Sequence, residues 1–118
     1  MATATITFNL AQSDFEGIVD IAGSGIGYWA TNLVVDNTGK GGQYIRYSVT
    51  DLEDYTEYTL TLKSVEQAIL DLHIAPTLND YYQGAIRQLV IHNDASDVGS
   101  DIADAIIQQA CFGKVVYG

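Results

Sequence analysis

The order of the hydrophobic patterns along the chain constrains its fold more than any other feature. Apolar residues alternate with polar ones, as in half-buried strands, mostly in the first half, whereas helical spacing of apolar residues prevails in the second half. This segregation favours an α+β fold over an alternating α/β fold. The links between successive predicted strands are too short for helical crossovers, so we expect a small antiparallel sheet.

Four segments are predicted as strands, and they cover residues 2–10, 28–35, 43–50 and 55–62. In the first of them, Phe8 and Leu10 share one face with Ala4 and Ile6. The second and third lie on either side of a glycine-rich turn, residues 36–42, and this arrangement is typical of a β-hairpin. The predicted sheet therefore has about four strands.

About four short helices are predicted, mainly in the second half of the chain. They cover residues 13–23, a segment from residue 64 to shortly before Pro76, residues 78–91 and residues 101–112. Ser13 with Glu16, and Ser64 with Gln67, have the spacing of a capping box. On the last helix we expect an inward stripe of Ile102, Ala105, Ile106, Gln109 and Ala110.

The acidic charge of the chain disfavours some partners. There are 15 acidic residues against five basic ones, for a formal net charge of −10. The basic residues are scattered, and they are Lys40, Arg46, Lys63, Arg87 and Lys114. We therefore expect no direct nucleic-acid binding, because a polyphosphate is bound by clustered Lys and Arg. The charge fits a basic protein partner, and it also has a simpler explanation, since a high net charge keeps a small protein in solution.

No pattern in the sequence indicates catalysis. His73 and His92 fall at predicted helix ends, where the helix dipole stabilises a cation. Cys111 has no Cys-x-x-Cys partner, and no His, Cys or Asp pair has the local spacing of a zinc site. The acids from Asp94 to Asp104 do not follow the pattern of a calcium loop. We therefore expect a protein that is not an enzyme and that holds no metal or cofactor.

Length and targeting signals restrict the organisation and location of the protein. A chain of 118 residues is near the commonest size for one domain, so we expect a single domain over residues 1–118. The lone Cys111 cannot form an internal disulfide, which fits a reducing cytoplasm. The first residues do not have the pattern of a signal peptide, and no apolar run is long enough to span a bilayer. We expect no membrane partner.

Two segments are candidates for a ligand site. Residues 23–27 include three glycines, which let a ligand or a neighbouring chain approach the backbone, and aromatic residues follow at once. The other segment is residues 112–117. The candidate ligand-binding residues are Gly23, Ser24, Gly25, Gly27, Tyr28, Trp29, Arg46, Phe112, Lys114 and Tyr117. The alternative for the first segment is a helix cap followed by core aromatic residues.

The carboxyl-terminal residues 115–118 are apolar where a terminus is ordinarily polar. We expect them to be buried in the fold or against a second subunit, so a homo-oligomer is predicted. The eight tyrosines of the chain fit this prediction, because tyrosine is enriched at interfaces, and they also fit a simple role as strand formers.

Several blocks of the sequence resemble a family of small, largely uncharacterised proteins from tailed phages and prophages. The blocks are Gly-Ile-Gly-Tyr-Trp-Ala at residues 25–30, Tyr-Thr-Leu-Thr-Leu at 58–62, Asp-Ala-Ile-Ile-Gln-Gln-Ala-Cys-Phe-Gly at 104–113 and Val-Val-Tyr-Gly at 115–118. Where such proteins often carry glutamate before the glycines, this chain has Ala22, Gly23 and Ser24. The resemblance implies a phage protein in the host cytoplasm, and small non-enzymatic phage proteins commonly antagonise bacterial defence.

Three functional hypotheses follow. The first is a counter-defence protein that binds and sequesters a nucleotide-derived immune signal, with glycine amides and Arg46 or Lys114 on its phosphates and aromatic side chains on its base. The alternative is an acidic inhibitor of a host defence effector, which would mimic DNA. Its contacting acids would be Asp51, Glu53, Asp54, Asp94, Asp97, Asp101 and Asp104. A third hypothesis is a phage structural protein without a ligand.

Overall fold

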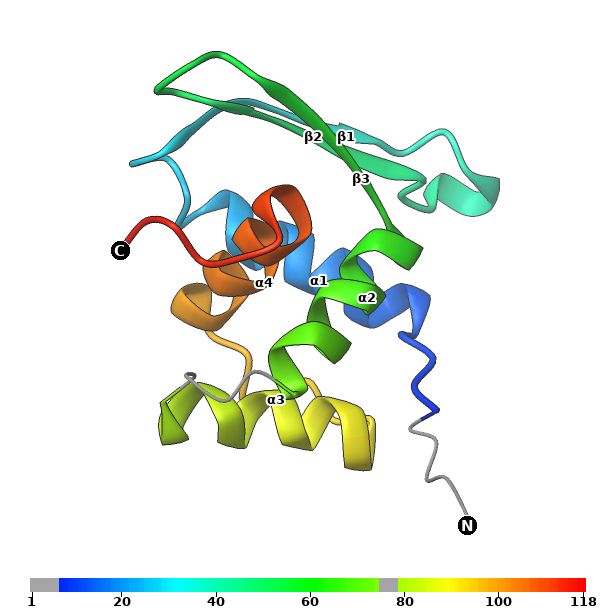
Figure 1. Cartoon of the computed structure of the whole chain (residues 1–118). Helices are drawn as coiled ribbons and strands as arrows, with labels where there is room; N and C mark the ends of the chain where they lie inside the picture. Colours follow the sequence, from blue (N-terminus) through cyan, green and yellow to red (C-terminus); the bar gives the residue numbers. More distant parts are fainter. Residues whose placement is uncertain (1–6, 75–78) are drawn as a thin grey trace, which may run out of the picture.

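The computed structural model describes residues 7–74 and 79–118, and these residues form an α+β fold. A three-stranded antiparallel sheet covers one side of the helices (Figure 1). The elements are α1 (Gln12–Gly23), β1 (Ala30–Asp36), the 3₁₀ turn η1 (Lys40–Gly42), β2 (Arg46–Asp51), β3 (Glu57–Thr61), α2 (Leu62–His73), α3 (Asp80–His92) and α4 (Ser100–Phe112). The predicted fold class is confirmed, with three strands where about four were expected.

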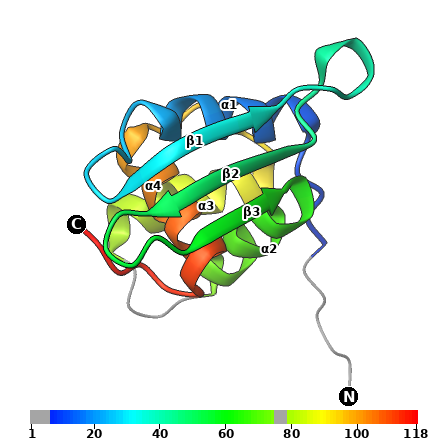
Figure 2. The same ribbon diagram turned by 90° about the horizontal axis from the view of Figure 1, so that it is seen from above.

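The sheet has the order β1-β2-β3, so the predicted hairpin and the strand that follows it are both present. The inner face of the sheet carries Tyr47, Val49 and Leu60, which are buried against the helices. The register of β1 on β2 shifts between Thr31 and Val34, and Asn32 within this bulge has a positive φ of 52°. The β1–β2 connection extends beyond the helical layer, away from the carboxyl terminus (Figure 2).

The first predicted strand is not part of the sheet where the structure describes it. Residues 2–6 lie outside the described residues, and residues 7–10 have no strand pairing. The backbone N–H of Leu10 donates to a carboxylate oxygen of Glu66 on α2 at 2.8 Å, so a side chain takes the place of a sheet neighbour. Phe8 and Leu10 are nevertheless buried, which explains their alternation with polar residues.

Two helix starts differ from the predicted capping boxes. Helix α1 begins at Gln12 behind Ala11, which makes no side-chain cap, and Glu16 instead accepts a hydrogen bond from the Tyr44 backbone N–H at 3.2 Å. Helix α2 has a capping box between Thr61 and Ser64, one turn before the predicted one. Helix α2 ends at His73, and α3 ends at His92, so both histidines lie at helix ends as predicted. The predicted stop at Pro76 lies outside the described residues.

Helix α4 lies at the centre of the fold. Ile102, Ala103, Ile106 and Ile107 are buried on it, and α1, α2 and β3 all contact it. Helix α3 lies on the side of the other helices that faces away from the sheet (Figure 1). The last residue of α4, Phe112, packs edge-on against Tyr58 of β3 with ring centroids 5.2 Å apart. The chain therefore leaves α4 directly beneath the sheet.

The glycine segment after α1 yields a stability prediction. A Cβ atom on Gly25 would lie 3.2 Å from the Cβ of Ser100 at the start of α4, whereas a Cβ on Gly27 would meet nothing within 4 Å. We expect Gly25→Ala to lower the free energy of unfolding by about 1–2 kcal/mol, because α4 must shift. The matched variant Gly27→Ala should change it by less than about 0.5 kcal/mol. Urea unfolding followed by circular dichroism measures both, and equal losses would contradict this packing role.

Candidate binding site

Three aromatic side chains from distant parts of the chain meet beneath the β2–β3 turn. Trp29 precedes β1, Phe112 ends α4, and Tyr117 lies in the segment that follows α4. The rings of Trp29 and Tyr117 stack at 14° with centroids 5.6 Å apart, and Phe112 lies 5.3 Å from Trp29 and 5.9 Å from Tyr117. The structure therefore brings the two predicted segments together.

Asp104 of α4 fixes the first of these segments. One carboxylate oxygen accepts hydrogen bonds from the Trp29 indole N–H and from the Gln108 amide, both at 2.8 Å. The other oxygen accepts from the Tyr28 hydroxyl at 2.5 Å. Partial burial and the bond to Asp104 raise the pKa of Tyr28 to about 12. The side chains of Tyr28 and Trp29 are thus both tied to α4 through Asp104.

Gln108 fixes the second segment. Its side-chain oxygen accepts from the backbone N–H groups of Val116 at 2.8 Å and Tyr117 at 2.7 Å, and its amide donates to the Tyr117 carbonyl at 3.1 Å. One side chain therefore satisfies three backbone groups of this segment. Gln108 is only 1% exposed, so these bonds are shielded from water. The prediction that Gln109 faces inward was off by one residue, because Gln109 is only partly buried.

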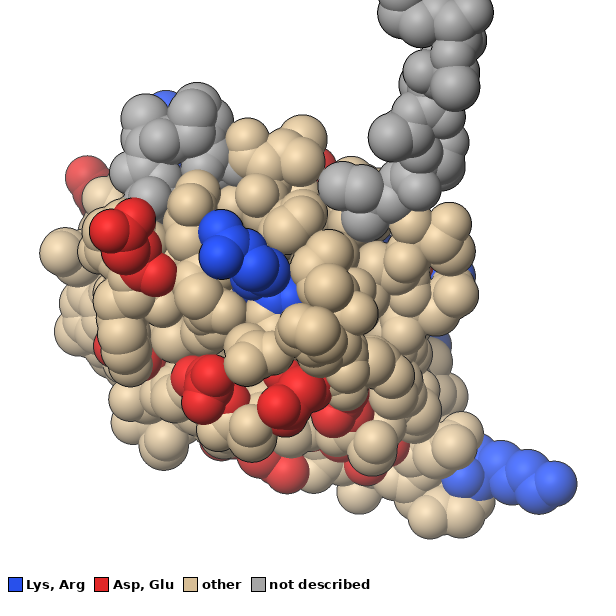
Figure 3. Space-filling view, turned by 90° about the horizontal axis from the view of Figure 1, so that it is seen from below, with Lys and Arg blue, Asp and Glu red and all other residues tan. Residues whose placement is uncertain are grey.

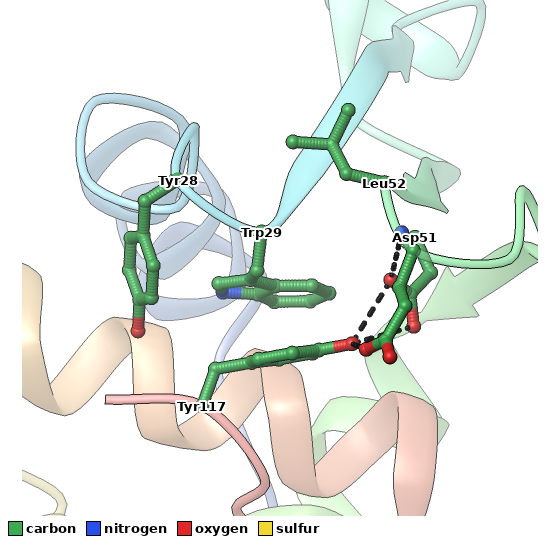
Figure 4. A pocket seen from close by; sticks show the side chains of 6 residues that line it. Tyr28, Trp29, Asp51, Leu52 and Tyr117 are labelled. Atoms are coloured by element: carbon green, nitrogen blue, oxygen red, sulfur yellow. Dashed lines mark hydrogen bonds between the residues drawn. The ribbon is translucent and has the colours of Figure 1, made fainter.

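The Tyr117 hydroxyl reaches two carboxylates at the end of β2. It lies 3.1 Å and 3.2 Å from the two oxygens of Asp51 and 2.9 Å from an oxygen of Glu53 (Figure 4). The bond to Glu53, burial and the bond to Asp51 together raise the pKa of Tyr117. Asp51 is 5% exposed and also accepts from the Glu53 backbone N–H at 2.9 Å.

Two neighbouring hollows open around Tyr117. The first, which we name the Asp51 hollow, has a volume of about 190 Å³ and is lined by Tyr28, Trp29, Asp51, Leu52, Glu53 and Tyr117. The second, the Asp101 hollow, has a volume of about 140 Å³, and Tyr82, Asp101, Asp104 and Tyr117 are among its lining residues. Each hollow combines two carboxylates with tyrosines, and neither has a Lys or Arg among the lining residues.

Several predicted ligand residues lie elsewhere or have other roles. Arg46 pairs with Asp36 at 3.1 Å, at the far end of β2 from Asp51. The two lie five positions apart along the strand, or about 17 Å at 3.3 Å per residue. Lys114 is exposed and lines neither hollow.

The glycine segment closes α1. Gly23 is the last residue of α1 and Ser24 is its carboxyl cap. The amides of Ser24, Gly25 and Ile26 donate to the carbonyls of Ile21 and Ala22, so these amides are already in use within the protein. The helix-cap alternative therefore describes this segment better than a phosphate cradle does.

Leu52 and Gln108 were not predicted as site residues. One feature of the sequence could have indicated Gln108, because it is a polar amide residue that directly follows the apolar residues Ala105, Ile106 and Ile107 in a predicted helix.

No histidine or cysteine is among the lining residues of either hollow. His73 and His92 end their helices and line neither hollow. Burial raises the pKa of the Cys111 thiol to about 12, which makes it a poor nucleophile near neutral pH. Across residues 7–74 and 79–118 no group of three or more His, Cys, Asp or Glu side chains could hold a metal ion. The arrangement is suited to binding by charge and aromatic contact.

Outside the hollows, the acidic residues are dispersed. Asp94 accepts from the Ser96 backbone N–H at 2.9 Å within the α3–α4 loop and lines neither hollow. On the face that points away from the sheet, acidic groups lie in separate places to the left of and below a central basic side chain, and they do not form one continuous surface (Figure 3). The carboxylates are therefore most closely grouped around Tyr117, where four of them line the two hollows.

The role of Gln108 gives a second prediction. Gln108→Leu leaves the backbone amides of Val116 and Tyr117 without their acceptor, so we expect a loss of about 1–3 kcal/mol of stability. Tyr117 should then leave Trp29, which is the only tryptophan, and its fluorescence should shift to longer wavelength. The control is Gln109→Leu, one residue along the same helix. A wild-type emission spectrum for Gln108→Leu would disprove this role.

The tyrosine environments give a third prediction. The pKa is raised to about 12 for Tyr28 and, by burial, to about 12 for Tyr47, and it is also raised for Tyr117. The unfolded chain releases these protons near pH 10, before the folded protein does. The contribution of these tyrosines to stability should therefore be constant up to about pH 10 and fall as pH rises towards 12. Tyrosinate absorbance and urea midpoints at stepped pH measure this, and Tyr47→Phe should reduce the slope.

The described part of the chain has no helix long and apolar enough to cross a membrane. Comparisons with protein-family models, with curated proteins and with solved structures found no match.

Proposed function

We propose that this protein is a non-catalytic binding protein that holds a basic partner protein against the hollows around Tyr117. The observation that carries the proposal is the composition of these hollows. Asp51 and Glu53 line one, Asp101 and Asp104 line the other, and no Lys or Arg lines either. Exposed tyrosine lies beside the carboxylates, since Tyr28 is 55% exposed. Carboxylates with aromatic rings form a surface that attracts cationic side chains.

The charge of the whole chain supports the same partner class. A net charge of −10 accelerates the approach of a basic protein and slows that of an acidic one. Two hollows that share Tyr117 suit two basic side chains of one partner. The hollows are also smaller than the roughly 300–1,000 Å³ of pockets that enclose a small-molecule ligand, which favours side chains as their occupants.

Sequestration of a nucleotide-derived signal is the second candidate. It is favoured by the convergence of Phe112 and Tyr117 on Trp29, because the partly exposed Tyr117 could stack on a base, although Trp29 itself is 2% exposed. Against it, a phosphate in the Asp51 hollow would meet Asp51 and Glu53, and Arg46 lies at the other end of β2. We therefore rank it below a basic protein partner.

The resemblance to phage accessory proteins would make the partner a host protein and the host cytoplasm the place of action. The protein would then act as an inhibitor of a defence effector.

Self-association also remains a proposal. Val115 and Val116 are 44% and 50% exposed next to Tyr117, so they offer an apolar contact to a second copy.

The test is a titration of the protein with a peptide of alternating Arg and Gly, followed by calorimetry and by Trp29 fluorescence. We expect binding that weakens as salt increases. The double variant Glu53→Gln with Asp101→Asn should weaken it about tenfold, which corresponds to about 1.4 kcal/mol.

The control is Asp14→Asn with Glu57→Gln, which changes the net charge equally outside both hollows. Equal losses in the two double variants would show that only the net charge matters. A matched Glu-Gly peptide should not bind. Binding of a cyclic dinucleotide, without binding of the basic peptide, would reject the proposal in favour of nucleotide sequestration.

A further inference from the structure

We infer that the Asp51 hollow binds one arginine side chain, with its guanidinium group placed between the carboxylates of Asp51 and Glu53. This inference rests on the proposed function and names the group that the hollow recognises. It is argued from the hydrogen bonds, the lining and the size of the hollow.

The carboxylates of the hollow have too few donors. Three carboxylate oxygens, two from Asp51 and one from Glu53, lie within 3.2 Å of the Tyr117 hydroxyl, which has a single proton to donate. The first Asp51 oxygen also receives the Glu53 backbone N–H, but the second has no other donor among the described residues. When the proton of Tyr117 points to Glu53, this oxygen is left without a partner in a side chain that is 5% exposed.

A buried carboxylate oxygen without a donor is costly, and two carboxylates that share one hydroxyl repel each other. A group that brings both positive charge and several N–H donors would remove both costs. A guanidinium group has five N–H donors in a planar fork and can donate to two carboxylates at once. An ammonium group is a compact and more strongly hydrated charge, so it gains less here.

The walls of the hollow fit the same group. Trp29 and Tyr117 lie with their rings 14° from parallel, and Leu52 lies on the other side of Trp29 from Tyr117 (Figure 4). Trp29 is only 2% exposed and lies behind these walls, so the accessible contact comes from Leu52, which is 41% exposed, and from the partly exposed Tyr117. Apolar and aromatic surface of this kind suits a guanidinium plane and the methylene groups before it. A volume of about 190 Å³ has room for the end of one long side chain. A bare metal ion fits less well, because a hard cation takes about six oxygen ligands.

The experiment titrates the full chain with N-acetyl-arginine amide and follows calorimetric heat and Trp29 fluorescence. The matched ligand is N-acetyl-citrulline amide, which has nearly the same shape but no charge. N-acetyl-lysine amide tests the choice of cation. We expect the arginine compound to bind most tightly and the citrulline compound not to bind. Equal binding by citrulline or by lysine would overturn the assignment to a guanidinium group.

The variants are chosen so that a general loss of charge is distinguishable from loss of the site. Glu53→Gln should weaken the arginine compound about tenfold, or about 1.4 kcal/mol. Asp54→Asn removes the same charge one residue away, outside the hollow, and should change its affinity less than twofold. Asp54 accepts the Thr56 backbone N–H in the turn, which asparagine can also do. Equal effects of the two variants would overturn the site.

Tyr117→Phe gives a second check, which compares how much the ligand raises the melting temperature of the variant and of the wild type. This variant leaves Asp51 and Glu53 without the hydroxyl, so the arginine compound should raise its melting temperature more than that of the wild type. No difference in this shift would count against donor shortage as the basis of binding. If the arginine compound does not bind but the Arg-Gly peptide still does, this inference fails and the proposed function stands. If neither binds, both fail.

Discussion

The buried amide of Gln108 is the interaction on which the rest of the site depends. With one side chain it satisfies two backbone N–H groups and one carbonyl of the segment after α4, and it donates to Asp104 as well. A segment of a few residues has little apolar surface with which to offset the entropy of being ordered. These shielded hydrogen bonds supply the fixed position that hydrophobic burial alone would not. Tyr117 is placed against Trp29 and Asp51 as a result.

The same network explains why negative charge gathers at this place. Asp104 is needed to receive the Trp29 indole N–H, the Tyr28 hydroxyl and the Gln108 amide. Asp51 ends β2 and receives the Glu53 amide in the turn that follows. Each acid thus has a structural partner, yet together they surround Tyr117 without a Lys or Arg among the lining residues. The carboxylates around Tyr117 are held by bonds within the protein. Because no base lines the hollows, a cation bound there would stabilise this surface further.

Sequence patterns predicted the fold class and most elements, because β2, β3 and the helices follow the period of their own type. They were wrong for residues 7–10, where alternation arises from burial of Phe8 and Leu10 without a strand partner. Periodicity also could not choose between Gln108 and Gln109, which flank the same apolar stripe. That choice is made by the segment containing Val116 and Tyr117, a tertiary contact that no local pattern reports.

The distance of Arg46 from the site has a consequence for the approach of a partner. Arg46 and Lys40 lie at the hairpin end of the sheet with Asp36, whereas Asp51, Glu53 and Asp54 follow the opposite end of β2. Residues 36–46 hold two bases and one acid, whereas the β2–β3 turn holds acids and no base. The sheet therefore carries an electric dipole along β2. In the field of the basic partner proposed above, this dipole would favour an approach in which the Tyr117 side comes first.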